Sequence, residues 1–143
     1  MVIVAAIKGS DQLTEIATEA EKLARAFDEP LHFVHVIEET EYTRLVEKQS
    51  SKREGDTEGT VEGDAAEAAV AGIDGVVDAD YELVGLVGNP SEEVVDYADD
   101  VGARYIVVGG RARSPTGKAL FGSVSQSILL KSDRSVVTII DRE

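Results

Sequence analysis

Residues 105–123 read YIVVGGRARSPTGKALFGS. An apolar run ends in the glycine pair Gly109-Gly110 and leads through a loop to Gly122 and Ser123. Glycine has no Cβ, so backbone N–H groups beside it can approach a ligand closely. Gly122-Ser123 opens a predicted helix, and the start of a helix presents unpaired N–H donors to an anion. The loop also carries three positive charges, on Arg111, Arg113 and Lys118. The segment Gly109 to Ser123 therefore predicts an anion-binding loop, and the alternative is a surface loop whose glycines only make turns.

Five short apolar runs are predicted to be strands. Val and Ile dominate them and polar alternation is weak, which is typical of strands buried on both faces of a sheet. The runs cover residues 2–7, 31–37, 81–87, 105–108 and 136–140.

Helical patterns lie between the strands. Apolar residues recur at steps of three and four over 11–27, with Ser10 or Asp11 as the cap. Further helices are expected over 61–73, from Asn89-Pro90 to a cap at Gly102, and over 123–131. The polar stretch 39–60 is expected to be a mobile crossover with one helical turn near 42–48. This alternation predicts one α/β domain over 1–143, an open parallel five-stranded sheet with helices on both faces.

Composition excludes several classes of protein. Hydrophobic residues make up 43% of 143, which is typical of a globular chain, and no apolar run approaches the length that spans a bilayer. The chain is therefore expected to be cytoplasmic. It contains no cysteine, which excludes thiolate metal sites and cysteine nucleophiles, and two histidines argue against a histidine-rich metal site. No metal ligand and no catalytic residue is predicted.

The formal net charge of −14 disfavours binding to nucleic acid and insertion into anionic membranes. Two interpretations compete for this charge. The favoured one is adaptation to a salt-rich cytoplasm, as in a halophilic archaeon, where ions screen the repulsion between carboxylates. The other is an acidic surface that binds a basic partner.

Several segments together resemble the universal stress protein family. Gly109 and Gly122-Ser123 match the first and the closing positions of its phosphate loop, G-x2-G-x9-G-[ST]. Residues 88–94 are similar to its G-x-P-x-E-E-I segment, and residues 103–109, 31–36 and 135–140 are similar to its strands. The resemblance covers most of the chain and implies a Rossmann-like fold of the adenine nucleotide alpha hydrolase type.

The resemblance also implies a nucleotide site. ATP or AMP is the expected ligand, with a magnesium ion if ATP binds, and a small anion is the alternative. The residues that match ligand-binding positions are Ala6, Ile7, Lys8, Val36, Val108, Gly109, Ala112, Gly122, Ser123, Val124 and Ser125. Val36 matches the position whose backbone meets adenine, and the residues from Val108 onward match the phosphate side.

Two residues depart from the family pattern. Lys8 stands where ATP-binding relatives have an aspartate that helps to hold the nucleoside, and a lysine cannot accept a hydrogen bond from ribose or base. Ala112 stands where the loop has its second glycine, which matters most if the position needs a positive φ. Lys8 either meets an anion itself, which would favour AMP, a cyclic nucleotide or phosphate, or has no ligand role.

The two histidines are expected to be structural or solvated rather than catalytic. His35, in an apolar strand, is predicted to be a hydrogen-bonded core residue, and His32 is expected near a strand edge in contact with solvent.

Three functions are weighed. The favoured one is a stress-related regulatory module that binds a nucleotide or anion with a partly degenerate loop. It would act as a homodimer through the apolar edge strand that runs from Val136 to Ile140, as the resemblance implies. The second is a weak ATPase or an autophosphorylating protein with Ser114, Thr116 or Ser123 as the acceptor. The third is a dimeric scaffold that binds no nucleotide.

Overall fold

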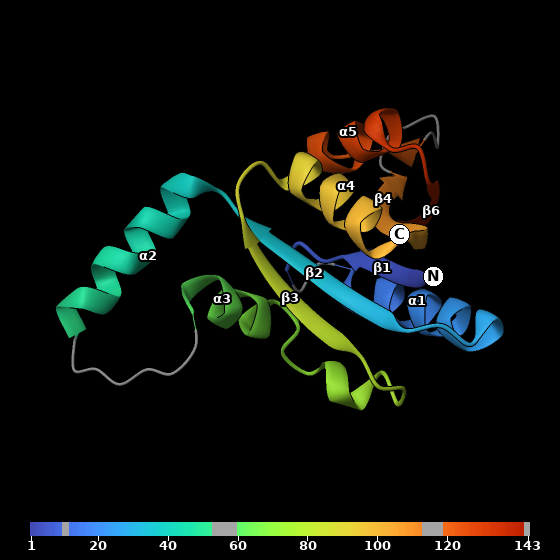
Figure 1. The fold of residues 1–143 in the computed structure, drawn as a ribbon, viewed down its shortest axis with the longest axis horizontal. Coiled ribbons are helices and arrows are strands. Elements are labelled where there is room, and N and C mark those ends of the chain that lie inside the picture. The colour runs from blue at the N-terminus through green and yellow to red at the C-terminus, as the bar shows by residue number, and fades with distance from the viewer. Residues whose placement is uncertain (10–11, 53–59, 113–118, 142–143) are drawn as a thin grey trace.

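The computed structural model describes residues 1–9, 12–52, 60–112 and 119–141, and helices and strands alternate along them (Figure 1). In chain order the elements are β1 (Val2–Ala6), α1 (Leu13–Phe27), β2 (Leu31–Ile37), α2 (Glu39–Lys52), α3 (Val61–Ala69), the 3₁₀ helix η1 (Ile73–Gly75), β3 (Glu82–Val87), α4 (Pro90–Val101), β4 (Ala103–Ala112), β5 (Ala119–Leu120), α5 (Ser123–Lys131) and β6 (Ser135–Asp141).

Five strands pair in parallel in the order β3-β2-β1-β4-β6. The two-residue β5 adds a short antiparallel pair to the end of β4. The chain builds outward from β1 to β3 and then crosses back to place β4 and β6 on the other side of β1. The strand order therefore reverses between β1 and β4, and the predicted open parallel sheet is confirmed.

Helices cover both faces of the sheet, and each strand sends alternate side chains to each face. On β1, Ile3 and Ala5 join the core that α1 covers, whereas Val4 joins the core under α4 and α5. Phe33 on β2 is fully buried in the first core, against Tyr81. Since the strands are buried on both sides, their sequences lack polar alternation.

The expected caps of α4 are confirmed. The Asn89 side chain accepts a hydrogen bond from the Glu92 N–H at 3.1 Å, and Gly102 ends the helix in the left-handed region with φ 70°. These two caps fix where β3 ends and where β4 begins. The start of α4 therefore lies at the carboxyl edge of the sheet.

Four boundaries differ from the predictions. The glycine pair does not end β4, because the strand continues through both glycines to Ala112, where β5 pairs with it. The stretch after β2 is a full helix, α2, rather than a mobile crossover, because strong helix formers and acids in the first turn outweigh its polarity. α1 begins at Leu13 with Gln12 as its cap, and the predicted caps at 10 and 11 lie outside the described residues. α3 ends at Ala69, earlier than predicted, and a turn follows.

The expectation that His32 lies near a strand edge is wrong, and its side chain is half-buried rather than fully in contact with solvent. β2 is an internal strand, so the side chain packs under α4, where its Nδ1 lies 2.7 Å from the Tyr97 hydroxyl. The loss of water around the imidazole lowers the pKa of His32, and Glu82 opposes this shift.

Candidate functional site

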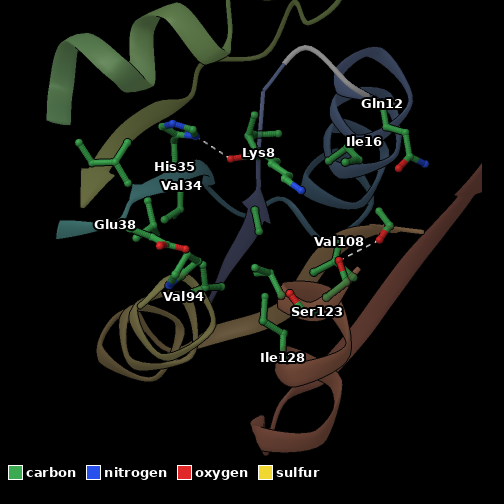
Figure 2. A pocket seen from close by; sticks show the side chains of 18 of the residues that line it. Lys8, Gln12, Ile16, Val34, His35, Glu38, Val94, Val108, Ser123 and Ile128 are labelled. Atoms are coloured by element: carbon green, nitrogen blue, oxygen red, sulfur yellow. Dashed lines mark hydrogen bonds between the residues drawn. The ribbon is translucent and has the colours of Figure 1, made fainter. Parts of the chain in front are cut away.

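A cavity of about 610 Å³ lies at the carboxyl ends of β1, β2 and β4, beside the point where the strand order reverses (Figure 2). Open parallel sheets bind ligands at this position, and small-molecule sites commonly enclose roughly 300–1,000 Å³. The start of α2, the start of α4 and the first turn of α5 complete the wall. The fold thus builds a ligand-sized hollow where the topology favours one.

Most of the sequence-predicted site residues meet in this cavity. Lining it are Ala6 at the end of β1, Ile7 and Lys8 after it, Val36 on β2, Val108 and Gly109 on β4, and Ser123, Val124 and Ser125 on α5. Their role as ligand contacts stays a prediction. The loop residues 113–118, which include Arg113 and Lys118, lie outside the described residues.

Gly122 is not among the described lining residues. Ala112 pairs with Ala119 in the β4–β5 ladder, and among the described non-glycine residues a positive φ occurs only at Gln12 and Asp28. Position 112 therefore does not require glycine for its backbone conformation. Gly122 caps α5 in an extended conformation, and a Cβ built there would meet no atom of the described residues within 4 Å. Internal packing does not explain this glycine, whereas close approach of a ligand would.

Lys8 follows β1, the central strand, and its exposed side chain lies between the His35 side and the Gln12 side of the cavity (Figure 2). No described residue forms an ion pair with it. Among the described lining residues it is also the one lysine or arginine. Lys8 therefore brings to the cavity a positive charge that forms no ion pair with a described residue, in a chain of net charge −14.

His35 fixes the backbone just before Lys8. Its Nδ1 lies 2.9 Å from the carbonyl oxygen of Ile7, which can only accept a hydrogen bond. Nδ1 must therefore carry a proton and donate it, so in the neutral ring Nε2 is the acceptor. This matches the prediction of a hydrogen-bonded histidine, and the same residue also lines the cavity.

Gln12 ties the start of α1 to the ends of two strands. Its Nε2 donates to the carbonyl oxygen of Gly110 at 2.9 Å and to that of Ile139 at 3.2 Å. The residue has φ 61°, an uncommon conformation for glutamine that surrounding contacts must maintain. Gln12 thereby closes the α1 side of the cavity.

The first turn of α5 faces the cavity with Ser123, Val124 and Ser125. The Ser125 hydroxyl donates to the carbonyl oxygen of Gly109 at 2.9 Å, which holds the helix start against the end of β4. The first N–H groups of a helix have no partner within the helix and carry the positive end of its dipole. This side of the cavity suits a negatively charged ligand group.

The opposite side is acidic. Glu38, Thr40 and Glu41 line it at the start of α2, and Figure 2 shows Glu38 on the side of Val94. Glu41 lies 3.8 Å from Arg44, and no described residue forms an ion pair with Glu38. Carboxylates repel phosphate and accept hydrogen bonds from N–H donors. The cavity therefore has one end, at the start of α5, that favours a negatively charged ligand group. The other end, at Glu38 and Glu41, favours a ligand group that donates hydrogen bonds.

The sequence analysis missed several lining residues. Gln12, His35 and Glu38 each lie close to the carboxyl end of a strand. The predicted alternation of strands and helices could therefore have indicated that these three residues are near the site. Pro90 and Val94 belong to the start of α4, which the cap at Asn89 already placed at that edge. The side chain of Ile128 comes from the second turn of α5, and no pattern in the sequence indicated that it reaches the cavity.

The described residues form neither a metal-binding cluster nor a membrane-spanning helix. Across the described ranges, three or more histidine or acidic side chains nowhere gather in a group that could hold a metal ion. The described helices are also too short or too polar to cross a membrane.

A family model described as the universal stress protein family matches residues 1–139. Among curated proteins, the stress response protein NhaX of Bacillus subtilis is 36% identical over 61 residues, which are 43% of this chain and 37% of that protein. The universal stress protein MJ0577 of Methanocaldococcus jannaschii is 33% identical over 54 residues, 38% of this chain and 33% of that protein. These matches cover less than half of the curated relatives' own length.

Solved structures match over nearly the whole chain. A universal stress protein from Archaeoglobus fulgidus superimposes with a TM-score of 0.67 at 29% identity, covering 97% of this chain and 98% of its own. The universal stress protein from Archaeoglobus fulgidus in complex with dAMP gives a TM-score of 0.64 at 26% identity, covering 97% of each chain.

Proposed function

Because the chain belongs to the universal stress protein family, we propose that it is a regulatory module that holds an adenine nucleotide, or a smaller anion, in the cavity between β1, β2 and β4. The observation that carries this proposal is the meeting of Lys8, Gly109 and Ser123 around one cavity of about 610 Å³. These residues are far apart in sequence, and each would contact the ligand with a positive charge or with backbone donors. The similar protein in complex with dAMP supports a nucleotide as the ligand.

The charges around the cavity suggest an orientation for the ligand. The phosphate would lie against the first turn of α5, where Ser123 and Ser125 start the helix. The base would lie toward Val36 and Glu38, where a carboxylate can accept from an exocyclic amino group. The ligand would then cross the end of β1 at Lys8.

Calorimetry with AMP, ATP and inorganic phosphate tests this proposal. Gly122→Ala should weaken AMP binding several-fold, because the new Cβ stands where the backbone meets phosphate, and should leave stability unchanged because the space is open. Gly75→Ala is the matched control, since its Cβ also meets open space but the residue belongs to η1, which precedes β3 and contributes no described residue to the cavity wall, whereas Gly122 caps α5, whose first turn lines the cavity. Absence of binding by all three compounds would refute the proposal.

We further propose that the loop is partly degenerate. Ala112 is the departure from the ATP-binding pattern within the loop, and Lys8, after β1, is the departure on the nucleoside side of the same site. The double variant Lys8→Asp with Ala112→Gly should bind ATP more tightly than the original chain. An unchanged affinity for ATP would mean that the pocket serves a different ligand.

The homodimer is proposed to form through β6. Among the described strands β6 pairs only with β4, so its outer edge offers unpaired N–H and C=O groups to a second copy. Thr138→Lys places a charge on this edge strand and should shift the protein from dimer to monomer in sedimentation velocity. A monomeric original protein at micromolar concentration would contradict the dimer.

A further inference from the structure

Lys8 stands at the centre of the cavity rather than at either end. β1 is the middle strand of the sheet, with β2 on one side and β4 on the other, and Lys8 lies two residues after its end. The anion-favouring end of the cavity lies beyond β4 at Ser123, and the acidic end lies beyond β2 at Glu38. A ligand that spans the cavity therefore places its middle part over Lys8.

The part of the ligand that meets Lys8 follows from the proposed function. If the base lies toward Val36 and the 5′-phosphate lies against Ser123, the middle part of the ligand is the ribose. The Lys8 ammonium then faces the ribose hydroxyls. An ammonium has three donors and no acceptor, so it cannot accept the hydrogen bonds that these hydroxyls would donate.

We propose that Lys8 makes this site selective for nucleotides that carry a phosphate on the ribose 2′- or 3′-oxygen in addition to the 5′-phosphate. A charge-assisted hydrogen bond to a phosphate is roughly twice as strong as one to a neutral hydroxyl. Dinucleotide-binding folds discriminate in the same way, because a carboxylate there binds a ribose hydroxyl whereas a cation accommodates a ribose phosphate.

The surrounding charges support this assignment. Among the described lining residues Lys8 is the one lysine or arginine, and no described residue forms an ion pair with it. Glu38 and Glu41 line the β2 side and would repel a second phosphate from that end. With the 5′-phosphate against Ser123, the favourable place that the described lining residues leave for a ribose phosphate is beside Lys8.

Isothermal titration calorimetry at low ionic strength tests the proposal with 5′-AMP, adenosine 2′,5′-bisphosphate and adenosine 3′,5′-bisphosphate. One of the bisphosphates should bind about tenfold more tightly than 5′-AMP, the gain expected from one charge-assisted contact. Lys8→Met should reduce the ratio of the two affinities to about one, and Lys8→Asp should invert it. Lys22→Met, on an exposed lysine that pairs with Glu19, is the control and should leave the ratio unchanged.

The outcomes separate the two proposals. Equal binding of 5′-AMP and both bisphosphates would overturn the selectivity and leave the nucleotide site intact. A preference for a bisphosphate that survives Lys8→Met would also overturn it, because another group would then bind the extra phosphate. Absence of binding by all three compounds would overturn both the selectivity and the proposed function.

Discussion

The side-chain oxygen of Gln12 lies 2.6 Å from the point where a Cβ on Gly109 would stand. Real Cβ atoms do not approach an oxygen so closely, so the Gln12 side chain can keep this position only if residue 109 has no Cβ. Gly109 therefore has a packing reason to be glycine that is independent of any ligand. The amide that occupies this space also binds the carbonyl oxygens of Gly110 and Ile139.

This contact predicts a non-additive pair of substitutions. Gly109→Ala should destabilise the protein by about 1–3 kcal/mol, because the new methyl group displaces the amide and breaks its hydrogen bonds. In a Gln12→Ala background the same change should cost much less, since the nearest contact is gone and the next one, with the Cδ1 atom of Ile16 at 3.2 Å, involves the end of a flexible side chain. Urea denaturation of the two single variants and the double variant measures the coupling. Strictly additive free energies would contradict the contact.

Gly85 lies where the start of α3 rests on β3, and a Cβ there would collide with the backbone carbonyl of Glu62. Because the obstacle is backbone, it cannot rotate away, and Gly85→Ala should destabilise the protein by about 1–3 kcal/mol. Gly75→Ala is the control, since its Cβ meets no atom within 4 Å. Thermal denaturation that finds the two variants equally stable would contradict this close packing.

The ion pair between Glu29 and Arg104 predicts a loss of stability in acid. Arg104 donates to both carboxylate oxygens, at 2.9 and 2.6 Å, and these bonds lower the pKa of Glu29 below its usual 4.5. The stabilisation is therefore present above about pH 4.5 and is lost as pH falls through the lowered pKa. Glu29→Gln should thus be less stable than the original chain at pH 7, and the difference should shrink at pH 3. A difference that does not depend on pH would argue against the pair.

His32 predicts a pH dependence in a higher range. Burial lowers its pKa from 6.5, so the unfolded chain binds the proton more readily than the folded one. Its contribution is complete above about pH 6.5 and is lost as pH falls through the lowered pKa. An NMR titration should give a value below 6.5, and Glu82→Gln should lower it further, because Glu82 opposes the shift. An increase in the His32 pKa in that variant would contradict this account.

The net charge of −14 predicts that salt stabilises the protein. Added potassium chloride screens repulsion among the carboxylates, and the Debye length falls from about 10 Å at 0.1 M to about 3 Å at 1 M. The melting temperature should rise over this range and should continue to rise above it if the chain is adapted to a salt-rich cytoplasm. A melting temperature that falls with salt would contradict net repulsion among the carboxylates as the dominant electrostatic effect on stability.

The sequence alone determined the sheet, because runs such as residues 2–7 are apolar at every position, and such short runs rich in Val and Ile are typical of strands buried on both faces. It also determined the ends of α4, because the Asn89 cap and the glycine at 102 act on their own local backbone. Only the tertiary structure decided the shape of the cavity wall. The contact of Gln12 with Gly110 joins residues 98 positions apart, and the length of β4 depends on its pairing with β5. The helix and strand propensities of single residues carry no information about such contacts, because these contacts form only once the strands have paired in their final order.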